Sequence, residues 1–210
     1  MNWLSELKKS ISAGILIGFA GFIYLNVGGV LGSLLFSIGL IFVCKFGLNL
    51  YTGKAGSVKL DVLDWHVSLL ELGKILVGNI IGTIIVSIFT HNLIDPSQII
   101  SVRSQSDIYT AFILGIGCGI LMEFAVWGWK NAESKIEGMI IIMMCVTAFI
   151  MSGFYHCIAD SYYYACSVIS GNRNGISLGV YLVTILGNFL GCNLRRLLME
   201  WKNEDKWKKY

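Results

Sequence analysis

The chain has 210 residues, of which 55% are hydrophobic and 14% are charged, and its formal net charge at pH 7 is +3. Soluble domains carry about 25% charged residues, and one aqueous core cannot bury so much apolar surface, so the composition excludes an ordinary soluble domain. We expect an all-α integral membrane protein. No linker or low-complexity tract divides the sequence, which indicates a single membrane domain over residues 1–210.

Residues 1–10, MNWLSELKKS, predict a short amphipathic helix on the membrane surface, with Lys8 and Lys9 near the lipid headgroups. A transmembrane helix requires about 20 apolar residues. The charged and aromatic residues of 200–210 predict a cytoplasmic tail that anchors at the interface. Between these ends the sequence predicts six spans, at 11–27, 30–51, 74–94, 108–129, 137–169 and 176–199.

Two of the six spans are expected to be broken helices. The second span runs into LYTGKAG, where Thr52, Gly53 and Gly56 indicate a break. The fifth span is too long for one simple helix and contains SGFYHCIAD (Ser152 to Asp160) near its middle. Irregular backbone at membrane depth is tolerated only where it is buried in protein or lines a cavity. The two breaks therefore point to one pore.

The two halves of the chain resemble each other. The third span contains VGNIIGT from Val77 and the sixth contains LGNFLGC from Leu186, while glycine-rich runs start at Gly14 in the first span and at Gly115 in the fourth. Spans one to three thus pair with spans four to six, and an offset of three spans means that the halves insert with opposite topology. Such an inverted 3+3 repeat, with a broken helix in each half, is typical of a transport fold with its site near the bilayer midplane.

Each half also carries a glycine–asparagine pair, Gly78-Asn79 and Gly187-Asn188. The interpretation we favour is helix packing, because the glycines allow close approach and the asparagines bond across helices. Alternatively, the asparagine side chains hold the broken segments or face the pathway.

Basic residues are distributed unequally between the two sides of the membrane. With six spans, the two termini share one side with the loops after spans two and four. Arg103 and Arg173 lie on the other side. The first side holds thirteen: Lys8, Lys9, Lys54, Lys59, Lys74, Lys130, Lys135, Arg195, Arg196, Lys202, Lys206, Lys208 and Lys209. The positive-inside rule predicts that both termini of this multi-pass protein are cytoplasmic, in the cell (inner) membrane.

His156 and Asp160 form a titratable pair inside the apolar fifth span. Ionisable residues within a membrane are costly and mark functional sites, although a histidine can also be a satisfied core residue. Asp160 lies on the same helical face as His156 and either accepts from the ring or caps neighbouring backbone. An ionised Asp160 would oppose anion entry, so we expect it to be protonated, turned away, or paired with His156 or another cation. Thr52 lies at the corresponding break in the first half.

Three further groups of residues have more than one interpretation. Lys45 and Glu123 are lone charges in apolar spans; they either pair or, as we favour, reach an interface or a subunit contact. Tyr162, Tyr163 and Tyr164 either line a vestibule or form an aromatic belt or protomer contact. The six cysteines are scattered without a CxxC motif, which favours small buried residues over disulfides or a metal site.

Several of these motifs together resemble the formate/nitrite transporter family: LYTG from Leu50, SGFYHCIAD, the region of Cys118, and the two glycine–asparagine pairs. The resemblance covers most of the chain, in order. It implies a homopentamer of aquaporin-like protomers, each with one pore for a small monovalent anion such as formate, nitrite, hydrosulfide or lactate, often moved with a proton. It implies no cofactor, and nothing in the sequence indicates nucleic-acid binding.

The resemblance also assigns roles to individual residues, with Arg103 as the basic residue that draws anions from the external side. Together with the pair described above, it gives a substrate pathway of Thr52, His156, Asn188, Arg103 and Asp160. It gives a pore constriction of Phe36, Leu40, Leu50, Tyr51 and Phe149, in which Tyr51 replaces a phenylalanine common in the family.

Four positions depart from the family's pattern. Asn49 replaces an acidic residue, Gly119 an asparagine, Tyr155 a glutamate and Asp160 an asparagine. The fold and the class of protein survive these changes, whereas the particular anion does not follow from the resemblance.

The sequence thus predicts a channel or transporter for small monovalent anions or their conjugate weak acids, linked to protons because a bare anion crosses an apolar constriction at great cost. The alternative is a channel for a neutral or cationic solute such as ammonia, urea or water, to which Gly119 and Asp160 point. A purely structural membrane protein is a third reading. An intramembrane enzyme is disfavoured, because no metal-spacing pair or nucleophile motif accompanies His156.

Overall fold

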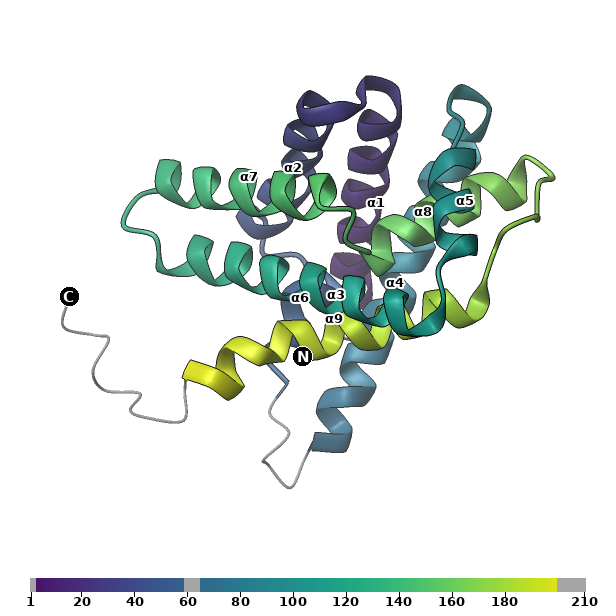
Figure 1. Cartoon of the computed structure of the whole chain (residues 1–210). Coiled ribbons are helices and arrows are strands. Elements are labelled where there is room, and N and C mark those ends of the chain that lie inside the picture. The colour runs from purple at the N-terminus through teal and green to yellow at the C-terminus, as the bar shows by residue number, and fades with distance from the viewer. Residues whose placement is uncertain (1–2, 59–64, 200–210) are drawn as a thin grey trace.

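The computed structural model describes residues 3–58 and 65–199, and of 65–68 and 196–199 it describes the backbone alone. The predicted tail at 200–210 lies outside the described residues. Within these limits the fold is all-helical (Figure 1). Its elements are α1 (Trp3–Val27), α2 (Gly29–Lys45), α3 (Tyr51–Ala55), α4 (Trp65–Thr90), the short 3-10 helix η1 (His91–Leu93), α5 (Ser97–Gln105), α6 (Ile108–Asn131), α7 (Lys135–Met151), α8 (Cys157–Ile169) and α9 (Leu178–Met199).

The prediction of six spans is confirmed, with four continuous helices and two broken ones. The segments long and apolar enough to cross a membrane unbroken are Trp3–Val27, Leu69–Leu93, Ile108–Asn131 and Leu178–Arg195. The second and fifth spans are split into α2 with α3 and α7 with α8. Because α1 is continuous from Trp3, residues 3–10 of the expected surface helix run directly into the first span.

The break in the second span lies earlier than the sequence indicated. Helix α2 ends at Lys45 and α3 begins at Tyr51, so the irregular backbone covers residues 46–50. Thr52 and Gly53 lie inside α3, and Gly56 follows its last residue. The predicted break at these three residues was therefore wrong by about one helical turn, whereas the break predicted in the fifth span is confirmed at residues 152–156.

A glycine with positive φ ends each broken helix. Gly47 has φ +61° after α2, and Gly153 has φ +70° after α7. This left-handed conformation turns the chain back, so that the Leu48 amide donates to the Val43 carbonyl at 2.9 Å. The corresponding bond beyond Gly153 measures 3.0 Å. Both helices thus end in the same glycine-dependent motif.

Asn79, on α4, holds the broken segment of the first half. Its Oδ1 accepts from the Tyr51 amide at 2.8 Å. Its Nδ2 donates to the Asn49 carbonyl at 2.8 Å and to the Ser10 carbonyl on α1 at 2.7 Å. One amide side chain therefore satisfies a carbonyl inside the break and the first amide of α3, and ties both to α1.

Asn188, on α9, does the same in the second half. Its Oδ1 accepts from the Cys157 amide at 2.9 Å, and its Nδ2 donates to the carbonyls of Tyr155 and Gly115 at 2.8 and 2.9 Å. The same three bonds reach corresponding positions in each half. The asparagines therefore bond across helices, as the favoured interpretation held, and also hold the broken segments, as the alternative held.

Glycines bring the long helices of each half into backbone contact. A Cβ at Gly82 would lie 2.2 Å from the Ile11 carbonyl oxygen, and a Cβ at Gly191 would lie 2.2 Å from the Ile116 carbonyl oxygen. The pairs α1–α4 and α6–α9 are thus built alike (Figure 1). Each short helix also packs against the long helices of the other half. Helix α3 contacts α6 and α9, and α8 contacts α1 and α4.

Replacing Gly82 by alanine is expected to destabilise the protein by about 3 kcal/mol, at the upper end of overpacking costs, because the new Cβ meets fixed backbone. The matched control is Gly73→Ala on the same helix, where a Cβ meets nothing within 4 Å. That change is expected to be neutral, or stabilising by up to about 1 kcal/mol. Thermal unfolding of both variants in detergent measures the difference, and equal melting temperatures would refute the backbone contact.

Replacing Asn188 by leucine is expected to cost more than about 3 kcal/mol, because buried backbone groups are left unsatisfied at about 1–3 kcal/mol each. Asn26→Leu is the control, since the exposed Asn26 side chain bonds only to the carbonyl of Phe22 in its own helix. Recovery of folded protein by size-exclusion chromatography and its melting temperature are the measurements. Normal yield and stability of the Asn188 variant would contradict the role assigned to this side chain.

Candidate functional site

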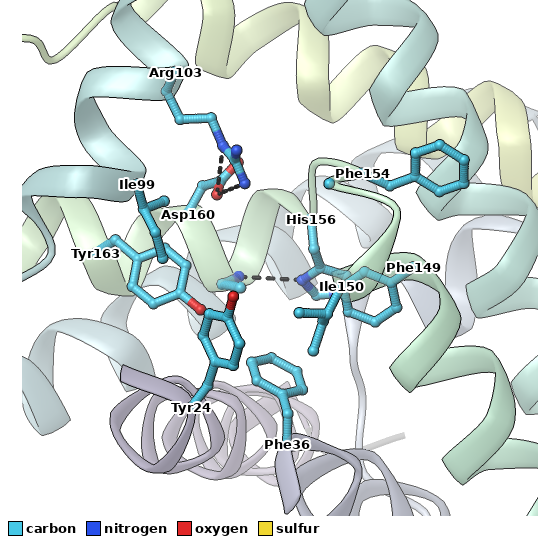
Figure 2. A pocket seen from close by; sticks show the side chains of 12 residues that line it. Tyr24, Phe36, Ile99, Arg103, Phe149, Ile150, Phe154, His156, Asp160 and Tyr163 are labelled. Carbon is cyan, nitrogen blue, oxygen red and sulfur yellow. Dashed lines mark hydrogen bonds and ion pairs between the residues drawn. The ribbon is translucent and has the colours of Figure 1, made fainter. Parts of the chain in front are cut away.

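A cavity of about 100 Å³ lies where α8 begins, between the end of α7, the helix α5 and the first two helices (Figure 2). The first turn of α8 forms one wall, and the ring of Phe36 from α2 faces it. Five of the predicted site residues line this cavity: Phe36, Arg103, Phe149, His156 and Asp160. These residues come from four different elements, so the fold brings them together.

Arg103 and Asp160 form an ion pair in the cavity wall. The Nε and Nη2 atoms of Arg103 each lie 3.2 Å from Oδ1 of Asp160. The two side chains are 11% and 3% exposed, and the guanidinium carbon lies 3.6 Å from the ring centre of Tyr155. Asp160 therefore neither orients His156 nor caps backbone; of the predicted environments, pairing with another cation is the observed one.

His156 caps the N-terminus of α8 with its own ring. Nδ1 accepts from the Ala159 amide at 3.1 Å. Since a neutral imidazole has one donor and one acceptor nitrogen, Nε2 carries the proton and donates to Oγ1 of Thr52 at 3.2 Å. The ring is 2% exposed. His156 is thus a neutral hydrogen-bond donor at the inner end of the cavity.

Thr52 reaches His156 because α9 positions the short helix α3. The thiol of Cys192 donates to the Thr52 carbonyl at 3.2 Å, and Nδ2 of Asn193 donates to the Ala55 carbonyl at 3.0 Å. Thr52 is itself fully buried. The N-terminal ends of α3 and α8, one from each repeat, therefore meet at the Thr52–His156 contact.

Aromatic rings close the cavity on the side of His156. Phe149 stacks on the imidazole with 5.6 Å between ring centres, and Phe36 meets Phe149 edge-on at 6.1 Å. The other three predicted constriction residues, Leu40, Leu50 and Tyr51, are buried in the same apolar cluster but lie outside the cavity lining. The hydroxyl of Tyr51 donates to the Ile185 carbonyl at 3.2 Å.

Thr52 and Asn188 also lie outside the cavity lining. Thr52 lies beyond the His156 ring, in contact with Nε2. Asn188 uses its amide to hold the Tyr155 carbonyl inside the α7–α8 break and the Cys157 amide that begins α8. Of the five predicted pathway residues, three therefore line the cavity, one contacts a lining residue, and one supports the backbone.

The environment of Glu123 differs from the interpretation that the sequence favoured. It is buried, and its Oε1 accepts from Nε of Arg195 at 2.9 Å, so reaching out to an interface was wrong for this residue. Pairing was the correct alternative, but Lys45 is exposed and is not the partner seen. The Glu123 carboxylate also contacts Gly56, which follows α3, because a Cβ there would lie 2.3 Å from Oε2.

The structure adds residues that the sequence reasoning missed. Tyr24, Ile99 and Phe154 line the cavity, and Figure 2 shows Tyr24 and Tyr163 with their hydroxyl ends pointing toward one another. Within the tyrosine triplet only Tyr163 lines the cavity, so the vestibule interpretation fits one tyrosine of three. Nothing in the uniform apolar pattern of the first span distinguishes Tyr24.

The six cysteines are free thiols, and most of them are buried residues, as the sequence predicted. Cys118, Cys157, Cys166 and Cys192 are buried, and Cys44 and Cys145 are partly buried. No group of three or more possible metal ligands occurs among the described residues.

Known proteins that are similar to this chain in sequence and fold are named as channels and transporters. A sequence model of the formate/nitrite transporter family matches residues 1–201. The uncharacterized transporter YrhG of Bacillus subtilis is 24% identical over 90% of this chain and 84% of its own, and the nitrite transporter NirC of Escherichia coli is 25% identical over 84% and 74%. The solved pentameric formate channel with formate bound matches with a TM-score of 0.78 and 26% identity, over 94% of this chain and 96% of that one.

The family match covers both halves of the repeat, both broken helices and every residue of the cavity wall. The fold agrees with a solved channel over nearly its full length. The chain therefore belongs to the formate/nitrite transporter family.

Proposed function

We propose that the chain is a proton-linked channel or transporter for small monovalent anions or their conjugate weak acids. The observation that carries the proposal is the cavity, which joins a cation, Arg103, to a neutral hydrogen-bond donor, His156, beside an apolar constriction. We further propose a homopentamer in the cell (inner) membrane with both termini cytoplasmic. The thirteen-to-two bias of basic residues supports that orientation.

Each lining group has a distinct task in this proposal. The positive charge of Arg103 raises the local concentration of anions at the external mouth. The Nε2–H of His156, now shared with Thr52, donates to the anion that arrives. The rings of Phe36 and Phe149 provide no charge-stabilising group, so the neutral conjugate acid passes them at lower cost than the anion. Transport of the acid moves one proton with each anion.

The named relatives support the substrate class. One solved relative holds formate, and one sequence relative is a nitrite transporter. Both are small anions with two oxygen atoms that accept hydrogen bonds. Such oxygens can accept from the Arg103 guanidinium in the cavity wall and from the His156 Nε2–H at its inner end once that N–H leaves Thr52.

A second candidate is a channel for a small neutral solute such as ammonia, urea or water. The observation in its favour is the Arg103–Asp160 ion pair, which offsets the positive charge of the cavity wall. Flux that does not depend on any anion would favour this candidate over the first.

Currents from proteoliposomes on a solid-supported membrane test the proposal. The reconstituted chain is challenged in turn with formate, acetate, lactate, nitrite and hydrosulfide at two pH values. We expect pH-dependent currents for a subset of these anions. His156→Asn is expected to lower them by about tenfold or more, since one donor contact of this kind is worth about 1.4 kcal/mol or more.

Asparagine is the suitable replacement because it can also cap the N-terminus of α8, so the variant keeps the fold while losing the ring. His91→Asn is the matched control, since His91 lies in η1 outside the cavity, and its currents are expected to equal those of the parent. Silence for every anion from assembled protein would reject the anion pathway. Undiminished currents in the His156 variant would remove His156 from it.

A further inference from the structure

The carboxylate of Asp160 is an anion of the proposed substrate class, already bound in the cavity. It resembles formate in having one carbon with two oxygens, and it lies against the only guanidinium that lines the cavity among the described residues. The inference below rests on the proposed function and concerns how this built-in carboxylate sets the affinity for the transported anion.

The ion pair uses part of the capacity of each partner. Both Nε and Nη2 of Arg103 are directed at a single oxygen, Oδ1, of Asp160. A guanidinium has five N–H donors and binds a carboxylate most strongly through two parallel bonds to two oxygens. The contact with Asp160 therefore falls short of the strongest arrangement, and a free anion with two oxygens can approach that arrangement.

The two partners differ in how they are held. Asp160 is fixed in the first turn of α8, where its amide donates to the His156 carbonyl at 2.9 Å, and its side chain is the more buried of the two. Arg103 comes from the external helix α5 on a long side chain, with more of its surface exposed. An anion from the external side therefore meets the more exposed guanidinium before the more buried Asp160 carboxylate.

We propose that Asp160 is a tethered competitor for Arg103, which weakens binding of two-oxygen anions and so sets the affinity and selectivity of the external site. An arriving formate or nitrite can bind the guanidinium only if it displaces Oδ1 of Asp160 or shares the Arg103 donors with it. Weak binding at the mouth suits conduction, because an ion must leave a site as readily as it enters.

The test is Asp160→Asn in proteoliposomes, with current recorded against the concentration of formate, nitrite, hydrosulfide and chloride. The asparagine keeps the shape and an oxygen acceptor for Arg103 but loses the charge. We expect the half-saturating concentration of formate and nitrite to fall about tenfold, the size that one charge-assisted hydrogen bond supports. The saturating current is expected to fall as well, because the anion leaves more slowly.

Two controls separate competition from the simple loss of a negative charge. Asp95→Asn removes an exposed external carboxylate that bonds to Ser97 instead of an arginine, and it should leave all half-saturating concentrations unchanged. Comparison between anions is the second control. A general electrostatic effect shifts all monovalent anions alike, whereas competition for the guanidinium fork shifts formate and nitrite more than chloride and hydrosulfide.

The half-saturating concentrations decide whether Asp160 competes for Arg103. An unchanged or higher half-saturating concentration for formate and nitrite in the Asp160→Asn variant overturns the proposal, as does an equal shift for all four anions. Asp160→Ser serves as a second variant. If neither variant assembles, the ion pair is required for folding, and the proposal is also overturned. Absence of current in the parent protein would instead reject the proposed function itself.

Discussion

Backbone satisfaction inside the membrane is the constraint on which the structure depends. A broken helix exposes amide and carbonyl groups that lipid cannot bond, at a cost of several kcal/mol for each group. Asn79 and Asn188 meet this constraint by bonding a carbonyl inside each break and the first amide of the short helix that follows it. Irregular backbone therefore persists at membrane depth in two places, and each place delivers a helix N-terminus to the interior.

The crossed arrangement of the short helices turns two separate breaks into one site. Because α3 packs against the second half and α8 against the first, the site does not belong to either repeat alone. The repeats differ at the corresponding capping position, which is Leu50 before α3 and His156 before α8. The same backbone arrangement thus places the apolar Leu50 at the start of α3 and the hydrogen-bonding His156 at the start of α8.

Much of the architecture could be predicted from apolar run length and from short matching motifs. The exact break in the second span could not, because Gly47 is one glycine among 24 and its positive φ leaves no mark in the sequence. The glycines at 53 and 56 drew attention instead, and they follow the break. Local composition therefore indicated that a break exists but not the residue that makes it.

The ion pairs were the other feature that sequence reasoning could not supply. Arg103 lies in α5 and Asp160 in the broken fifth span, and no helical or strand periodicity relates positions so far apart. The same holds for Glu123 and Arg195, which come from neighbouring helices of one repeat. The family pattern could locate Thr52, His156 and Arg103 but not the pairing of Arg103 with Asp160, since Asp160 is itself a departure from that pattern.

The cap on α8 has a consequence for the electrical state of the pathway. An imidazole that accepts through Nδ1 can take a second proton only by giving up its bond to the Ala159 amide. A charged ring would then leave the Ala159 amide in the first turn of α8 without its acceptor. It would also place a positive charge beside the positive end of the helix dipole. Folding and charge are thereby coupled at one atom. Under the proposed function, the proton that accompanies the solute is then carried by the solute or by water, and the ring donates a hydrogen bond without transferring its own proton.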